Sequence, residues 1–432
     1  MNLSLQIDSI FLAESQYIKS LYPFSIMHCG WEIRLGPFKY YEWIQKLFPK
    51  KRIIFNARET HLKSFLARQK HDDQTINKEN IFIINTAVIP GEQFFKNIDA
   101  AYKEYISDPN LSKSAVFVHQ GVPLAAYVTA EDIINPGQFD MKFLPKLLSD
   151  YSGLMPKLEI PMPEIINFLW DTLDITGELI SRGFKFFENQ SDFKKLEAQG
   201  IYFLNKDKIS IGNNCKIAPG TVLDASEAEI IIGNNVQIMA NAVITGPCFI
   251  GENSTVKISA KIYKNTAIGE WCKVGGEIEN SVIHAYSNKQ HEGFLGHSYI
   301  SEWVNLGADT NTSDLKNTYG NINVKIYNEQ FPTGRMFLGL MCGDHTKSAI
   351  NTSFTTGTIA GIASIIVADG FLPNYIPSFA WRGTKNCSYY KVEKAIETAR
   401  IVMQRRNKEL TPEEEELMRY EFEEAKNNFY NK

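Results

Sequence analysis

Several features that would place this chain in a particular class are missing from its sequence. No run of about 18 or more apolar residues occurs, so no membrane span is expected. Residues 1–8 lack a basic segment followed by an apolar one, which argues against a secretory signal. The 45 Lys+Arg and 49 Asp+Glu give a net charge of −4, which excludes a generic polyanion binder. We therefore expect a cytoplasmic protein with neither membrane nor nucleic-acid partners.

Closely spaced cysteines are also missing. The six cysteines lie far apart and form no C-x-x-C pair, which argues against a zinc ribbon or a redox dithiol, so no metal site is predicted. What remains is an ordinary globular composition, with 44% hydrophobic and 22% charged residues. A length of 432 residues predicts two to three domains.

Residues 1–205 have the pattern of a mixed α/β domain with a helical linker. Segments with helical spacing separate short runs of β-branched and aromatic residues, which predicts a sheet covered by helices. The expected strands are 53–55, 81–84, 115–118 and 125–128, and the expected helices include 40–48 and 94–106. Residues 141–185 are expected to be mainly helical, with Pro163 opening a helix that runs through Trp170.

A different pattern begins near residue 206 and predicts a parallel β-helix over residues 206–385. Aliphatic residues recur at every sixth position from 232 to 274, a period that neither an α-helix nor a simple strand produces. They are Ile232, Ile238, Ile244, Ile250, Val256, Ile262, Ile268 and Val274. Hexapeptide periodicity is typical of a triangular β-helix with three hexads per coil. The Gly-Asn pairs at 212–213, 233–234 and the equivalent positions suit its tight corners.

The hexad phase breaks between Val274 and Ile300. The corner-like Ile300 follows Ile268 by 32 residues, which is not a multiple of 18. We interpret the break as an excursion out of the prism that carries residues 287–297, and such a loop is a favoured place for function. Residues 386–432 predict a short helical tail with two helices, the second opened by Thr411-Pro412 and Glu414 as a capping box.

Residues 291–310, HEGFLGHSYISEWVNLGADT, carry a family resemblance. They resemble the H-x-x-Y-L-G-D-x-x-I-G-x-x-V-N-I-G-A-G-T segment of the bifunctional N-acetylglucosamine-1-phosphate uridylyltransferase/glucosamine-1-phosphate acetyltransferase family. This resemblance implies a left-handed β-helix, a homotrimer with sites between subunits, and acetyl-CoA as the acyl donor.

The resemblance also implies roles for individual residues. His291 falls on the general base and Asn305 on a residue that contacts the sugar. Gly307 and Ala308 fall on the corner that meets the CoA thioester, where backbone N–H groups suit a developing oxyanion. His297 stands where the family has Asp, and for it a structural role and a functional one remain equally open.

Three departures from the family pattern bear on the substrate. Phe294 replaces a tyrosine that contacts the sugar phosphate, Glu279 stands near the place of a phosphate-binding lysine, and Asp309 replaces a glycine. A glutamate repels phosphate, so glucosamine-1-phosphate itself is in doubt. Compensating positive charge is expected from Lys289, Lys316 or Arg335.

The N-terminal region resembles the nucleotidyltransferase half of the family with a degenerate signature. Residues 10–15 read IFLAES, without the glycine-rich loop L-x-A-A-G-x-G-T-R-M that approaches a triphosphate. Gly121-Val122-Pro123-Leu124 lacks the aspartate that would hold Mg²⁺. Arg34 and Gly36 are similar to a variant I-R-x-G stretch that would meet a phosphate, although a glycine turn beside a solvated arginine explains them equally well.

Three functions follow from these patterns. The first is acetyl-CoA-dependent N-acyl transfer to an amino sugar, its phosphate or its nucleotide, with His291 as general base. The second is sugar-1-phosphate nucleotidyl transfer with Mg²⁺, in which the β-helix serves for trimerisation. The third is a degenerate sensor of sugar nucleotides. The motif around His291 favours the first, and the missing glycine-rich loop counts against the second.

Overall fold

The computed structural model describes residues 3–70, 74–108, 111–133, 155–327, 329–367, 370, 372–383 and 386–430. The chain forms two compact units. The first comprises Met1–Leu21, His28–Ile33 and Phe38–Asn167, and the second comprises Tyr22–Met27, Arg34–Pro37 and Phe168–Lys432. The described helices include none that is long and apolar enough to cross a bilayer.

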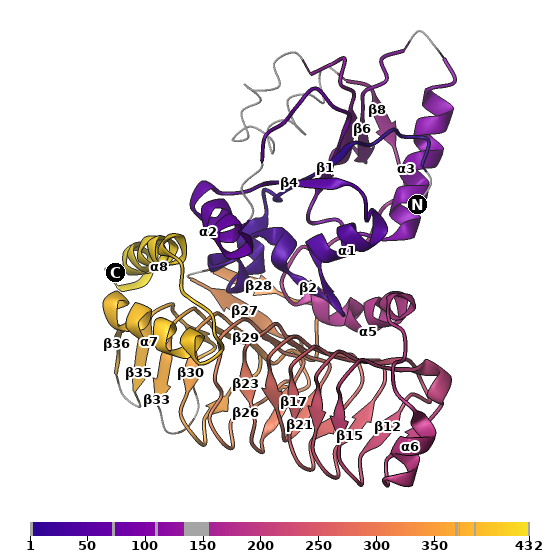
Figure 1. Ribbon diagram of the computed structural model, residues 1–432. Helices are drawn as coiled ribbons and strands as arrows, with labels where there is room; N and C mark the ends of the chain where they lie inside the picture. The colour runs from indigo at the N-terminus through magenta and orange to yellow at the C-terminus, as the bar shows by residue number, and fades with distance from the viewer. Residues whose placement is uncertain are drawn as a thin grey trace. The chain divides into compact units, whose positions relative to one another are not determined.

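The first unit is built on a six-stranded sheet in the order β4-β1-β5-β7-β6-β8. Strands β1, β4 and β5 are parallel, whereas β7 is antiparallel to both of its neighbours. The strands are β1 (Ser9–Ala13), β4 (Arg52–Asn56), β5 (Ile81–Asn85), β6 (Ala115–His119), β7 (Val122–Val128) and β8 (Lys157–Glu159) (Figure 1). All four predicted strands are confirmed.

Helices accompany this sheet, as predicted. They are α1 (Tyr40–Leu47), α2 (Glu59–Gln69) and α3 (Glu92–Tyr105). Each is amphipathic; in α3, Phe94, Phe95 and Ile98 recur on the buried face while the intervening residues are more exposed. The mixed α/β class of the N-terminal region is therefore confirmed.

The prediction that a helix begins at Pro163 is wrong. The helix that follows, α5 (Asp171–Gly183), begins only at Asp171. The backbone before it is extended because it pairs with the loop after β5: the Ile89 N–H donates to the Glu164 carbonyl and the Ile166 N–H to the Ala87 carbonyl. Tertiary pairing overrides the local helix signal there. The part of the predicted linker at residues 141–154 lies outside the described residues.

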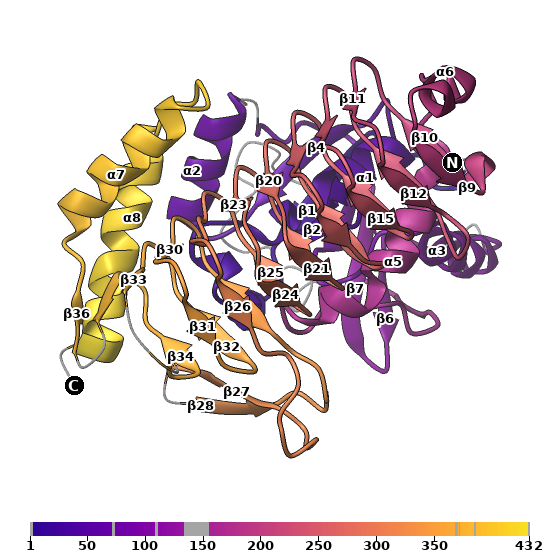
Figure 2. The same cartoon turned by 90° about the horizontal axis from the view of Figure 1, so that it is seen from below.

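The second unit contains the predicted left-handed parallel β-helix, and this fold class is confirmed. Its first sheet has nine strands: β10 (Ile209–Ile211), β13 (Ile230–Ile232), β16 (Cys248–Ile250), β19 (Thr266–Ile268), β22 (Val282–Ile283), β25 (Tyr299–Ile300), β29 (Leu340–Cys342), β32 (Thr358–Ala360) and β34 (Tyr375–Ile376). Every neighbouring pair in this sheet is parallel, and the successive coils stack as Figures 1 and 2 show.

Two further faces complete the prism. One contains β11 (Lys216–Ile217), β14 (Gln237–Ile238), β17 (Thr255–Val256), β20 (Lys273–Val274) and β23 (Asn288–Lys289), continued through bridges at Asn305 to β30 (Lys347–Ser348), β33 (Ile365–Val367), β35 (Ala380–Gly383) and β36 (Cys387–Tyr389). The other contains β9 (Tyr202–Leu204), β12 (Val222–Asp224), β15 (Val243–Thr245), β18 (Lys261–Ile262), β21 (Glu277–Glu279) and β24 (Phe294–Gly296). Strands β26 (Asn311–Thr312) and β31 (Ser353–Phe354) form a separate pair.

The sixth-position aliphatic residues form the core of the prism. Ile232, Ile250 and Ile268 pair in register on consecutive coils, and each is almost completely buried. Stacking one aliphatic side chain on its equivalent buries each of them without gaps. The hexad period therefore identifies the inward positions.

At the Gly-Asn corners, the glycine and the second asparagine have different roles. The left-handed backbone falls on the second asparagine, with φ of 57° at Asn214 and 57° at Asn235. Asparagine accepts this conformation more readily than most residues. The glycines permit close stacking of coils instead, because a Cβ on Gly212 would lie 2.7 Å from the Gly233 carbonyl carbon.

The predicted excursion at residues 287–297 is wrong. Ile268 pairs with Ile283 and Ile283 with Ile300, so this segment runs through ordinary coils with shortened corners. Two short coils shift the hexad phase as an insertion would, which is why the sequence pattern is ambiguous. The large departure from the prism occurs later, between β26 and β29, and contains the antiparallel hairpin β27 (Asn323–Ile326) and β28 (Glu329–Pro332).

The two C-terminal helices are confirmed as α7 (Val392–Gln404) and α8 (Pro412–Ala425). The Thr411 hydroxyl accepts from the Glu414 N–H at 3.2 Å, and the Glu414 carboxylate accepts from the Thr411 N–H at 2.8 Å, as the capping box predicts. The short helix α6 (Phe193–Ala198) lies before the first coil and is capped by Asp192.

Candidate functional site

The segment that carries the family resemblance folds as two consecutive coils of the β-helix. His291 lies on an exposed bend between β23 and β24. The next coil runs alongside: Asn288 pairs with Asn305, and the Asp309 N–H donates to the Glu292 carbonyl at 3.1 Å. The structure thus brings His291, Phe294, Asn305, Gly307 and Ala308 onto neighbouring coils.

Lys289 occupies an inward position of the prism. It is the register partner of Val274, which in turn pairs with Val256. Its ammonium donates to the carbonyls of His291 at 2.5 Å, Glu292 at 3.1 Å and Gly275 at 3.3 Å. Burial lowers the pKa of Lys289 to about 8, although Glu292 and Asp309 oppose the shift. The side chain fixes the bend that carries His291.

Asn305 and Phe294 are both half-buried. The Asn305 side-chain carbonyl accepts from the Asn288 amide at 3.3 Å, so the two asparagines form an amide ladder. The Phe294 N–H donates to the Asn311 side chain at 2.9 Å, and its ring covers Gly296, where a Cβ would lie 2.4 Å from the ring. Phe294 therefore offers an apolar surface beside the bend.

The two backbone N–H groups of the Gly307–Ala308 corner differ in their hydrogen bonding. The Gly307 N–H donates to the Ser348 hydroxyl at 3.1 Å and is already engaged. No acceptor for the Ala308 N–H is found among the described residues. Asp309 takes the left-handed conformation with φ of 55°, which explains how an aspartate replaces the glycine of the family pattern. Ala308 is thus the candidate oxyanion donor of this corner.

A second histidine is held by a carboxylate. The Nδ1 of His297 lies 2.8 Å from the Asp314 carboxylate, and its ring stacks on Phe337 with centroids 5.2 Å apart. Both partners belong to the insertion that leaves the prism after β26. The sequence does not reveal this arrangement, because the hexad phase indicates an excursion at residues 287–297 and the insertion lies after β26.

Lys316 and Arg335 lie in the same insertion and not on the two coils that carry His291. The Lys316 ammonium donates to the Asn321 carbonyl at 2.7 Å, and Lys316 lines a separate cavity described below. Arg335 binds Asp171 at 3.2 Å and also pairs with Asp174. Its charge is therefore neutralised by α5.

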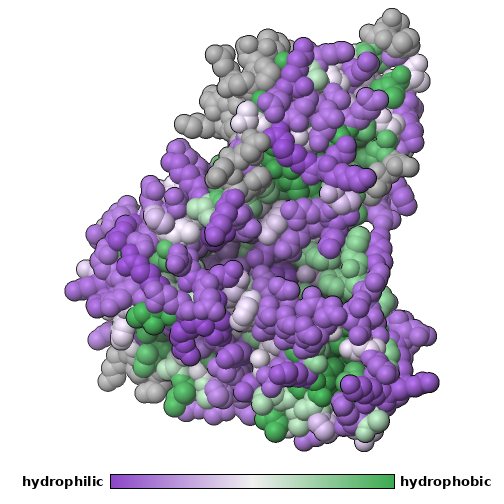
Figure 3. Space-filling view, in the orientation of Figure 1, coloured by the Kyte–Doolittle hydropathy of each residue, from purple (hydrophilic) through white to green (hydrophobic). Residues whose placement is uncertain are grey.

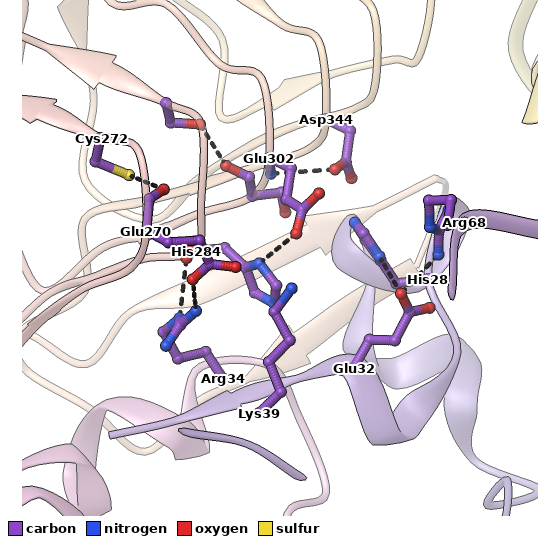
Figure 4. Close-up of polar contacts among 12 residues, drawn as sticks. His28, Glu32, Arg34, Lys39, Arg68, Glu270, Cys272, His284, Glu302 and Asp344 are labelled. Carbon is purple, nitrogen blue, oxygen red and sulfur yellow. Dashed lines mark hydrogen bonds and ion pairs between the residues drawn. The ribbon is translucent and has the colours of Figure 1, made fainter. Parts of the chain in front are cut away.

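Arg34 and Gly36 have structural contacts within the second unit. The Arg34 guanidinium is buried, donates to the His284 carbonyl at 2.9 Å and pairs with Glu270 (Figure 4). Nearby, His284 Nδ1 lies 2.9 Å from the Glu302 carboxylate. Gly36 has a φ of +63° and packs on α5, where a Cβ would lie 2.9 Å from the Ile180 nitrogen. These contacts account for both residues without a nucleotide.

In the first unit, a carboxylate follows β1 where the family has its glycine-rich loop. Glu14 is buried, binds the Arg58 guanidinium at 2.9 Å and accepts from the Gly30 N–H at 3.1 Å. Close by, Glu32 is buried between His28 and Arg68 (Figure 4). Burial raises the pKa of Glu32, but the Arg68 guanidinium, the contact with His28 and the Cys29 N–H outweigh it and hold the pKa at about 2.

The carboxyl ends of β1 and β5 enclose a cavity of only about 100 Å³. The described residues of its lining include Ser15, Asn85 and Thr86 but no lysine or arginine. Ligand pockets are usually about 300–1,000 Å³. Glu14 is committed to Arg58, so it does not fit a Mg²⁺ ligand, and the described residues contain no cluster of three or more His, Cys, Asp or Glu for a metal ion.

Comparison with known proteins supports the family resemblance. Residues 10–192 match the family model described as "Sugar nucleotidyl transferase". A bifunctional protein GlmU from Ruthia magnifica is 23% identical over 259 residues, covering 57% of this chain and 52% of that protein. A bifunctional protein GlmU from Rippkaea orientalis is 32% identical over 115 residues, covering 25% of this chain and 23% of that protein.

A shorter relative matches over most of its own length. It is the uncharacterized acetyltransferase YaiX of Escherichia coli, 28% identical over 221 residues, covering 51% of this chain and 86% of that protein. The chain spans about half the length of the first GlmU relative and about a quarter of the second. The resemblance to the bifunctional uridylyltransferase/acetyltransferase family is confirmed at this modest identity.

Proposed function

We propose that this chain is a transferase of sugar metabolism that moves an acetyl group from acetyl-CoA to the amine of an amino sugar, its phosphate or its nucleotide. The proposal rests mainly on two neighbouring coils that set the His291 bend beside the Gly307–Ala308 corner. The Asp309 N–H joins these coils by donating to the Glu292 carbonyl. The relatives named as acetyltransferase and as bifunctional protein GlmU support this choice.

The chemistry requires one base and one oxyanion donor. Acetyl-CoA supplies the thioester when bound. His291 takes the proton from the attacking amine as the N–C bond forms and returns it to the sulfur as the C–S bond breaks, so that the free thiol leaves. The Ala308 N–H stabilises charge on the carbonyl oxygen. Phe294 and Asn305 form the acceptor side, with Asn305 hydrogen-bonding the sugar. Substrates without a 1-phosphate suit a site where Glu279 and Phe294 replace phosphate contacts.

Nucleotidyl transfer with Mg²⁺ is the second candidate, since residues 10–192 match a sugar nucleotidyl transferase family. The Glu14–Arg58 pair counts against it, and so does the small neighbouring cavity, which no described lysine or arginine lines. A sensor of sugar nucleotides is the third candidate, and it requires no chemistry at either site.

Assembly as a cytoplasmic homotrimer belongs to the same proposal. Large apolar side chains are exposed on the β-helix, and Figure 3 shows hydrophobic patches between hydrophilic ones on the drawn face. They include Tyr202, Val243, Ile258, Tyr263 and Ile350. Three-fold packing of prisms would cover such surfaces. Light scattering at micromolar concentration should return three times the mass of the chain, and a monomer would refute the trimer.

The test of the function is release of free thiol from acetyl-CoA. Wild-type protein is mixed with a panel of amino sugars, their 1-phosphates and their nucleotide derivatives. We expect thiol release with at least one acceptor and acetylated product by mass spectrometry. No release across the panel would leave nucleotidyl transfer and the sensor of sugar nucleotides as the alternatives.

A further inference from the structure

A second cavity lies within the β-helix unit, where the insertion meets the last coils. Its volume is about 590 Å³, which is within the usual range for an organic ligand. One wall is the hairpin β27–β28, and the other is formed by β34 and the β35–β36 pair; Figure 2 shows this hairpin beside β34. The two coils that carry His291 contribute no lining residue.

The hairpin presents one polar face to this cavity. The residues of β27 alternate between exposed and buried, and its exposed Asn323 and Lys325 line the cavity together with Gln330 of β28, the register partner of Lys325. The buried Val324 and Ile326 anchor the opposite face. Gly357 has a φ of +67° and lets the hairpin approach closely, since a Cβ there would lie 2.7 Å from Ile322.

The opposite wall supplies an arginine. Arg382 lies opposite Cys387 in the β35–β36 pair, and both line the cavity. The Arg382 Nε is buried and has no hydrogen-bond partner among the described residues. The guanidinium also hydrogen-bonds the Cys387 side chain, so its strand partner holds Arg382 at the wall of the cavity.

The charges in the lining are all of one sign. Lys316, Lys325 and Arg382 are cationic, and the described lining residues include no Asp or Glu. The lining also contains Asn323, Gln330, Asn374 and Tyr375, whose polar groups suit hydroxyl and carbonyl groups. Arginine and lysine recognise phosphate oxygens by charge-assisted hydrogen bonds. A single phosphate ester carries about −1.5 to −2 at neutral pH, so a terminal diphosphate, whose inner phosphate adds a further negative charge, matches three cations better.

We infer that this cavity binds an organic diphosphate, with Lys316, Lys325 and Arg382 holding the phosphates and the amide side chains facing the organic part. The inference goes beyond acyl transfer and does not depend on it, because binding is measured without an acyl donor or acceptor amine. The diphosphate would be the terminal diphosphate of a nucleotide, and binding alone defines the site.

The test is isothermal titration calorimetry of the full chain with inorganic pyrophosphate, uridine diphosphate and inorganic phosphate. We expect uridine diphosphate to bind most tightly, pyrophosphate next and phosphate weakest, with all affinities falling as salt rises. Lys325→Gln and Arg382→Gln should each weaken diphosphate binding by about tenfold or more, because each removes a charged contact. The matched control Lys216→Gln, an exposed lysine on β11, should stay within about twofold of wild type, since it makes no contact in the cavity.

Three results would overturn the inference. They are no saturable binding of either diphosphate at millimolar concentration, phosphate binding as tight as that of pyrophosphate, or diphosphate binding unchanged in both variants. A fourth result, tighter binding of pyrophosphate than of uridine diphosphate, would show that the cavity does not recognise the organic part of the ligand. Lys325 is exposed, so its variant is informative even where Arg382→Gln fails to fold.

Discussion

His297 Nδ1 lies 2.8 Å from the Asp314 carboxylate, and this contact joins the β-helix to the start of its insertion. A carboxylate on Nδ1 fixes the tautomer and orientation of an imidazole, which is the arrangement of many general bases. The same contact also serves as a tether for the insertion. His291, by contrast, has an exposed side chain and is favoured by its place in the family motif.

The first prediction separates these two histidines. His291→Asn should lower acyl transfer by about 10²–10⁴-fold, the usual contribution of a positioned base. His297→Asn should lower it by less than about tenfold, because asparagine tolerates the φ of 43° at this corner and can still donate to Asp314. The measurement is thiol release under saturating acetyl-CoA.

Circular dichroism of both variants provides the control for folding. A larger loss in His297→Asn than in His291→Asn would transfer the role of base to the His297–Asp314 pair. In that case Asp314→Asn should reproduce most of the loss and alter the pH dependence of the rate.

The β-helix could be predicted from the sequence because its constraint is periodic. Each coil must bury one aliphatic side chain per face, so Ile232, Ile250 and Ile268 repeat at a fixed spacing that the chain itself displays. The capping box at Thr411 is likewise local and was predicted correctly. A pattern that lies within one coil or one turn can be recognised in the sequence without knowledge of the fold.

The features of the fold and of the site that the sequence does not predict depend on contacts between residues far apart in the chain. Shortened corners and an insertion shift the hexad phase alike, so the sequence pattern wrongly predicts that residues 287–297 lie outside the prism. Lys289 fills an aliphatic position, and only the register with Val274 shows that its charge is buried. Arg34 looked available for a phosphate because its partner Glu270 is 236 residues away in the chain.

The second prediction concerns nucleotidyl transfer by the first unit. Release of pyrophosphate from common nucleoside triphosphates with sugar-1-phosphates should be absent or very weak. The reason is that Glu14 occupies the place of the phosphate loop and neutralises Arg58. A coupled pyrophosphate assay with Mg²⁺ measures this. Robust turnover with any pair would make nucleotidyl transfer the main activity.

The third prediction concerns Arg34. Arg34→Ala should lower the free energy of unfolding by about 3 kcal/mol, since it leaves Glu270 and the His284 carbonyl without their buried partner. The control Lys206→Ala removes an exposed partner of Glu197 and should cost less than about 1 kcal/mol. Urea denaturation measures both. An unchanged stability accompanied by loss of nucleotide binding would restore Arg34 as a phosphate ligand.

The last prediction concerns the pH dependence of stability through Lys289. The pKa of this buried amine is about 8 in the folded protein and about 10.4 in an unfolded chain. Between these values the unfolded state binds more protons, so the contribution of Lys289 to the free energy of unfolding rises with pH. It is least favourable below pH 8, and the penalty of up to about 3 kcal/mol disappears above about pH 10.4.

Lys289→Met, which restores an apolar residue at an inward position, should therefore flatten the stability curve between pH 8 and 10.4. Denaturation with urea at pH 7.5, 9 and 10 at fixed protein concentration gives the difference between variant and wild type. The free energy of unfolding of Lys289→Met minus that of wild type should fall as pH rises. Lys216→Met, on the exposed face of β11, should follow wild type throughout. A difference that is constant over this range would show that the Lys289 amine keeps its proton equally in both states.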